Sequence, residues 1–124
     1  MRRTLAGFLL AAGLTGCAGP SDRCMDAGAA GRQIQTYLEG VSWIGKSAAV
    51  KSKDYENVYM VALNLSIGGD TEVGVFAVNS LDGDGKVFAV SGFAHQFSNA
   101  PYGPDSSAEI SPTSDGVEEV ASCV

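Results

Sequence analysis

The sequence predicts an α+β domain in which an antiparallel sheet is flanked by short helices. Strict apolar/polar alternation runs through residues 59–67, and two valine-rich segments follow it after turns that contain glycine and aspartate. Apolar residues recur at helical spacing only near the two ends of the domain. Consecutive strands joined by short turns favour an antiparallel meander, and we expect the helices to cover one face of it.

The first expected element is a helix over residues 25–39. Ile34 and Leu38 recur at helical spacing, and either Ser21 or Asp22 can cap its start. Glycines in its first half weaken an exposed helix by about 1 kcal/mol each, so tertiary packing must hold this half in place. The same small residues allow a neighbouring element to approach closely.

Three to four strands are expected next, because the apolar pattern changes to a period of two. The segment 72–79 carries apolar residues on both sides and is therefore expected to be central in the sheet and covered on both faces. The expected strands span residues 47–51, 59–67, 72–79 and 86–91, with turns at 68–70 and 81–85.

The segment after residue 92 leaves two alternatives open. Phe93, His95 and Phe97 share a face if it is a strand, whereas Phe93, Ala94 and Phe97 share one if it is a helical turn. Residues 99–113 contain three of the four prolines and are expected to form a Pro/Ser/Gly loop.

A short C-terminal helix is expected to close the domain. Val117 and Val120 lie at helical spacing, and Ser114 or Asp115 can cap the start of this helix.

The N-terminal segment has the form of an export signal. Arg2 and Arg3 precede a short apolar run, which ends at Leu14-Thr15-Gly16-Cys17. The run is too short to cross a bilayer, which takes about 20 apolar residues. The last four residues resemble the lipobox of bacterial lipoproteins.

This resemblance implies that Cys17 is lipidated and that the signal is removed before it. Residues 1–17 are then the signal peptide ending at the lipidated cysteine, residues 18–23 a tether and residues 24–124 a single domain. The expected location is the extracytoplasmic face of the cell membrane or outer membrane, and the export route, general or twin-arginine, stays open.

The mature domain also resembles a second group. The run AAVKSKDYENVYMVA at residues 48–62, the phrase GVFAVN at residues 74–79 and the closing Cys123-Val124 are similar to small lipoproteins of actinomycetes. Those proteins are largely uncharacterised, so this resemblance implies no activity and no site residues.

The charge balance restricts the possible partners. The chain has a net charge of −6, and without Arg2 and Arg3 six basic residues stand against fourteen acidic ones. No lysine or arginine follows Lys86. Such a surface repels nucleic acid phosphates, so nucleic acid is excluded as a partner. The expected partners are the membrane, through the lipid at Cys17, and an envelope protein or small ligand.

The cysteines indicate a disulfide. With Cys17 lipidated, Cys24 and Cys123 remain as an even pair in an exported protein, and we expect a bridge between them that pins the first and last helices together. A metal pair would need further soft ligands, and His95 is the single histidine. We therefore expect no metal and no cofactor.

Two further motifs favour structural roles over chemistry. Asp82 and Asp84 occupy the first and third positions of a calcium loop, but Lys86 stands at the fifth, so a hairpin turn is the better interpretation. The aromatic residues Trp43, Tyr59 and Tyr102, with Tyr55, suggest a binding surface that also includes His95; alternatively, Trp43 fills the junction between helix and sheet.

Two functional hypotheses follow. In the first, a non-catalytic domain of an envelope lipoprotein binds a partner or ligand. The alternative is a small surface hydrolase with His95 as general base, Ser91 or Ser98 as nucleophile, and Asp105 or Asp115 orienting the histidine. No Gly-x-Ser-x-Gly elbow accompanies these residues, and we therefore favour binding.

Overall fold

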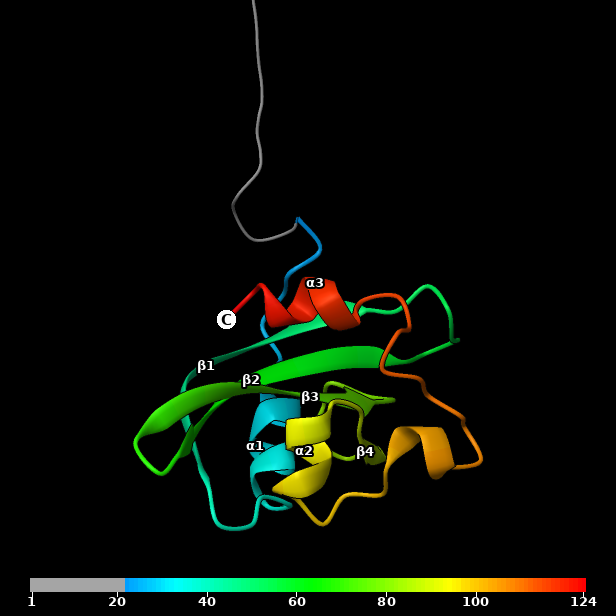
Figure 1. Cartoon of the computed structure of the whole chain (residues 1–124). Coiled ribbons are helices and arrows are strands. Elements are labelled where there is room, and N and C mark those ends of the chain that lie inside the picture. Colours follow the sequence, from blue (N-terminus) through cyan, green and yellow to red (C-terminus); the bar gives the residue numbers. More distant parts are fainter. Residues whose placement is uncertain (1–21) are drawn as a thin grey trace, which may run out of the picture.

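The computed structural model describes residues 22–124, which form an antiparallel four-stranded sheet with short helices (Figure 1). The expected signal peptide and Cys17 lie outside the described residues. Within these residues no helix has the length and apolar character needed to cross a membrane. In chain order the elements are α1 (Ala29–Gln35), β1 (Ser42–Lys51), β2 (Tyr59–Ile67), β3 (Asp70–Val78), β4 (Val87–Ala89), α2 (Gly92–Gln96), the 3-10 helix η2 (Gly103–Asp105) and α3 (Val117–Ala121).

The sheet is the expected meander, with strand order β1-β2-β3-β4 and antiparallel neighbours throughout. Ile67 pairs with Asp70, which leaves Gly68 and Gly69 as a two-residue turn. Both glycines have positive φ, 57° and 93°. Positive φ at both positions matches the twist of a hairpin, and glycine adopts it without steric cost.

The two outer strands differ in length from the sequence expectation. β1 begins at Ser42, five residues earlier than expected. A bulge between Ile44 and Ser47 shifts the register of this strand against β2. Gly45 within the bulge has a φ of 73°. The inserted residues break the alternation of period two, so the first half of the strand carries no strand signal in the sequence. β4 is shorter than expected, at three residues.

The helix expected over residues 25–39 is shorter in the structure. Residues before α1 pair with the edge of β1 instead, where Met25 and Ala49 exchange backbone hydrogen bonds of 2.9 and 2.7 Å. The N-cap of α1 is Gly28, so Asp22 does not cap it, contrary to expectation; Ser21, the other expected cap, lies outside the described residues. A Cβ at Gly31 would lie 2.8 Å from Ser47 Oγ, so this glycine allows the close approach of α1 to β1.

The helices lie on both faces of the sheet, and the expectation of a single covered face was wrong. Figure 1 shows α3 on one side and α1 with α2 on the other. The central strands are apolar on both sides and therefore need cover on both. On the α1/α2 side the core includes Ile34, Val61, Leu63, Phe76 and Ala94. On the α3 side it includes Val50, Met60, Ala62, Val117 and Val120.

The chain after β4 adopts the helical alternative. Ser91 Oγ caps α2 by accepting the Ala94 N–H at 3.2 Å, and it also accepts the Val75 N–H from β3 at 3.0 Å. At α3 the N-cap is Gly116, with no side-chain cap. The expected cap from Ser114 or Asp115 is therefore absent.

The segment 99–113 is a loop, as expected, but it is packed rather than free. Ile110 is only 1% exposed, and Tyr102 forms a parallel bridge with Ala89 of β4. A Cβ on Gly103 would lie 2.7 Å from the carbonyl oxygen of Ile110. Much of this loop therefore serves the fold.

Candidate functional site

The structure joins Cys24 to Cys123 in a disulfide with a Cα–Cα distance of 5.9 Å, in agreement with the pairing expected from the sequence. The bridge does not pin the two terminal helices together. Cys24 precedes α1 and packs with Cys123 on the α3 face, whereas α1 packs on the opposite face. The bridge thus fastens the start of the domain to the α3 side of the sheet.

Arg23, next to the bridge, is held by carboxylates of the C-terminal segment. Its two Nη atoms donate to Asp115 at 2.7 and 3.2 Å, and Nη1 also donates to Glu119 at 2.6 Å. The Arg23 and Asp115 side chains are each 25% exposed. The hydrogen bond from Arg23, followed by one from the Lys53 backbone N–H, lowers the pKa of Asp115 to about 2.

The turn between β1 and β2 extends this network. The backbone N–H of Asp115 donates to Asp54 Oδ2 at 2.7 Å. The Tyr55 hydroxyl lies 2.7 Å from Ser114 Oγ and accepts the Ser111 N–H at 3.2 Å. Tyr55 was expected on an aromatic surface, and this network was not expected. The expected Cys24–Cys123 bridge was the available signal, because it brings Arg23, the residue before Cys24, close to the C-terminal acids Asp115 and Glu119.

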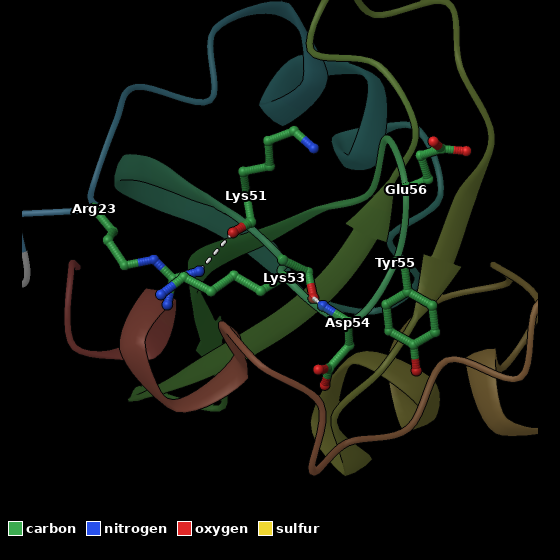
Figure 2. A pocket seen from close by; sticks show the side chains of 7 residues that line it. Arg23, Lys51, Lys53, Asp54, Tyr55 and Glu56 are labelled. Carbon is green, nitrogen blue, oxygen red and sulfur yellow. Dashed lines mark hydrogen bonds between the residues drawn. The ribbon is translucent and has the colours of Figure 1, made fainter.

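A depression of about 660 Å³ lies beside this network and is lined by Arg23, Lys51, Ser52, Lys53, Asp54, Tyr55 and Glu56. Figure 2 shows that the labelled side chains diverge: Lys51 and Glu56 extend to one side, and Asp54 and Tyr55 to the other. Arg23 and Asp54 are also engaged in structural hydrogen bonds. Such a depression has no polar groups converging on one ligand position, and we do not place the site there.

Two pairs of stacked rings flank α2. The His95 and Tyr102 rings stack with centroids 4.1 Å apart and planes inclined by 21°. Phe93 of α2 and Phe97, the C-cap of this helix, stack with ring centroids 6.4 Å apart and planes inclined by 10°. Ala94, between them in sequence, is buried, and Phe93 is 40% exposed. We call Phe93–Phe97 and His95–Tyr102 the α2 ring pairs.

The structure does not unite the residues expected to form a binding surface. Trp43 lies at the junction of α1 and β1, near Gly31, with a buried Nε1 that has no hydrogen-bond partner. Tyr59 lies at the opposite end of β2, six residues or about 20 Å along the strand from the partner of Trp43. Lys51 Nζ sits 5.7 Å from the Tyr59 ring centre. Only His95 and Tyr102 are brought together.

Of the groups considered for a hydrolase, both serines lie next to α2 but are engaged in local hydrogen bonds, and Asp105 follows Tyr102, whose ring stacks on His95. Ser91 caps α2, and Ser98 Oγ donates to the Ala94 carbonyl at 2.6 Å. Asp115 binds Arg23 beside α3, whereas His95 belongs to α2 on the other face of the sheet. The structure therefore places Asp115 away from His95.

The turn that contains Asp82 and Asp84 is held by local hydrogen bonds. Ser80 Oγ donates to Asp84 Oδ1 and accepts the Asp82 N–H, both at 3.1 Å. Gly83 has a φ of 88°, as a tight hairpin connection requires. Within the part of the chain that the structure describes, no group of three or more His, Cys, Asp or Glu residues is placed to hold a metal ion.

Comparisons of the chain with protein-family models, with curated proteins and with solved structures found no match. The chemistry of the α2 ring pairs and of the Arg23 network must therefore be interpreted from the residues themselves.

Proposed function

We propose that this chain is a lipid-anchored protein of the cell envelope whose extracytoplasmic domain binds a partner through the α2 ring pairs, without catalysing a reaction. The observation that carries the proposal is the separation of two surfaces by the sheet. Cys24, at the start of the described chain, packs with α3 on one face, and α2, which carries Phe93 and His95, lies on the other (Figure 1).

The attachment side follows from the lipobox and from the contacts of Arg23 and Cys24. Five residues lie between Cys17 and Arg23, and the six residue steps from one to the other span at most about 22 Å. Arg23 is bound to Asp115 and Glu119, and Cys24 is bound to Cys123. A lipid at Cys17 therefore keeps the α3 side of the domain close to the membrane.

The ring pairs then face away from the membrane, where partners of the envelope have access to them. An exposed aromatic ring offers a large contact area at low cost in side-chain entropy, which is why aromatic residues are enriched at interfaces. Phe93 is among the few large apolar side chains exposed in residues 22–124, and α2 positions it beside Phe97.

Site-specific photo-crosslinking in the intact envelope tests this proposal. A photoreactive amino acid replaces Phe93 in one variant and the exposed Glu56 of the β1–β2 turn in a matched control. We expect an ultraviolet-dependent adduct of defined mass at position 93 and none at position 56. Equal adducts at both positions, or none at position 93, would refute the assignment of the ring pairs.

Two substitutions at His95 separate binding from the alternative hydrolase. His95→Phe keeps a ring stacked on Tyr102 but removes the base, whereas His95→Ala removes both. A binding surface tolerates the phenylalanine and is weakened by the alanine. An enzyme with His95 as general base loses its activity in both variants.

A further inference from the structure

The charges around the α2 ring pairs define the chemistry of the partner. One residue of each pair is joined by a backbone hydrogen bond to a residue that has an exposed carboxylate side chain. The Glu39 N–H donates to the Phe97 carbonyl at 2.8 Å, and the Asp105 N–H donates to the Tyr102 carbonyl at 3.1 Å. Both Glu39 and Asp105 are exposed. An aromatic face beside a carboxylate attracts cations, through the ring quadrupole and through the opposite charge.

Basic residues of the described chain lie mostly elsewhere. Arg23, Lys51 and Lys53 line the depression at the β1–β2 turn, and Arg23 is bound to acids. Two cations are nearer: Lys86 lines a depression with Pro101, the residue before Tyr102, and the exposed Arg32 belongs to α1, which packs on the same face of the sheet as α2. No lysine or arginine follows Lys86 in the sequence; α2 itself carries no acidic residue, and the carboxylates of the segment after it begin at Asp105.

The two ring pairs lie on opposite flanks of a single helical turn. Phe93 and His95 are two residues apart on α2, so their side chains leave the helix in nearly opposite directions. A helix with its side chains is about 10–12 Å wide. Two cationic side chains of one extended polypeptide, four residues apart, are separated by about 13 Å, which is comparable to this width.

We infer that the α2 surface binds a basic polypeptide segment of a partner protein, with one arginine or lysine at Phe93–Phe97 beside Glu39 and a second at His95–Tyr102 beside Asp105. This inference rests on the proposed binding function and adds the chemical class of the partner. The acidic character of the surface complements a basic segment and disfavours an anionic one.

The test uses the protein solubilised from its envelope in detergent and two synthetic peptides. The first is built of glycine and serine with arginine at every fourth position, and in the second glutamine replaces every arginine. Titration calorimetry measures affinity, and amide chemical shifts map the contact. We expect binding of the arginine peptide alone, with shifts at residues 92–97 and 102–105, and weaker binding at higher salt.

Matched charge variants show which carboxylates contribute to the affinity for the arginine peptide. The double variant Glu39→Gln/Asp105→Asn removes one glutamate and one aspartate at the ring pairs. The control Glu56→Gln/Asp82→Asn removes the same two residue types from exposed turns elsewhere. We expect the first to weaken binding about threefold to tenfold and the control to change it less than about twofold.

Three results would overturn the inference: equal affinity for the glutamine peptide, equal loss in both double variants, or shifts confined to another surface. If the peptide fails to bind while position 93 still crosslinks a partner, the proposed function stands and only the basic chemistry is refuted. If Phe93→Ser retains both peptide affinity and partner capture, the ring pairs are not the binding surface and both proposals fall.

Discussion

Removal of the Cys24–Cys123 bridge is expected to cost this domain a large share of its stability. The two cysteines are 99 residues apart, so the bridge closes almost the whole domain into one loop. In the chain-entropy model a loop of about 100 residues restricts the unfolded state by about 4.7 kcal/mol at 25 °C. Small domains have total unfolding free energies of about 5–15 kcal/mol.

Noncovalent contacts near the bridge do not substitute for it. Arg23 with Asp115, and Met25 with Ala49, hold the same part of the chain in the folded state. These contacts are lost on unfolding and place no restraint on the unfolded chain, so they leave the entropy term intact. We therefore expect a loss of about 3–5 kcal/mol when both cysteines become serine.

Urea unfolding followed by circular dichroism measures this loss. All forms carry Cys17→Ala, so that the lipid and the third thiol are absent. With an m-value of about 1–3 kcal/mol per molar urea, the midpoint should fall by about 2 M in Cys24→Ser/Cys123→Ser. Cys123 is only 5% exposed, so serine at this position changes the core as well as the bridge. The urea midpoint of the reduced parent protein reports the loss of the bridge alone, because both cysteine side chains are kept.

Arg23→Gln serves as a neighbouring control, because it removes the adjacent ion pairs and keeps the bridge; its midpoint should shift by less. A loss below about 1 kcal/mol in both the reduced protein and the double variant would refute the loop-entropy argument. An altered m-value would instead locate the effect in residual structure of the unfolded chain.

Three further predictions concern the anchor, the loop and the Asp115 network. Cys17→Ala should move the protein from the detergent phase to the aqueous phase on phase partitioning, and equal partitioning of both forms would rule out the anchor. Ile110→Ala should lower the unfolding free energy by about 2–5 kcal/mol in urea, because Ile110 is 1% exposed within the core; a neutral result would mean that the loop is not packed. Asp115 has a folded pKa of about 2 against an ordinary 3.8, so its contribution is complete above pH 4 and is lost as the pH falls toward 2. Asp115→Asn should therefore show a shallower loss of stability than the wild type over this pH range, and identical slopes would contradict the ion pair.

Local patterns predicted the central part of the fold. The alternation in residues 59–67 and the paired glycines at 68 and 69 specify a hairpin, because both features act over only a few residues. The first half of β1 was missed since its bulge removes that alternation. The helical start at residue 25 was wrong because pairing of Met25 with β1 competes with helix formation, and no local pattern encodes that partner.

Alternation, turns and an even cysteine count are visible along the chain, and they were sufficient to predict the strand order, the α+β class and the pairing of Cys24 with Cys123. The choice among several possible partners of one side chain could be read only from the folded protein. Asp115 is a suitable helix cap, yet it binds Arg23, 92 residues away. Phe93 and Phe97 are the aromatic residues nearest to His95 in sequence, yet the His95 ring stacks on Tyr102. Such choices depend on which groups the sheet brings within a few ångströms, and this distance is a property of the folded chain.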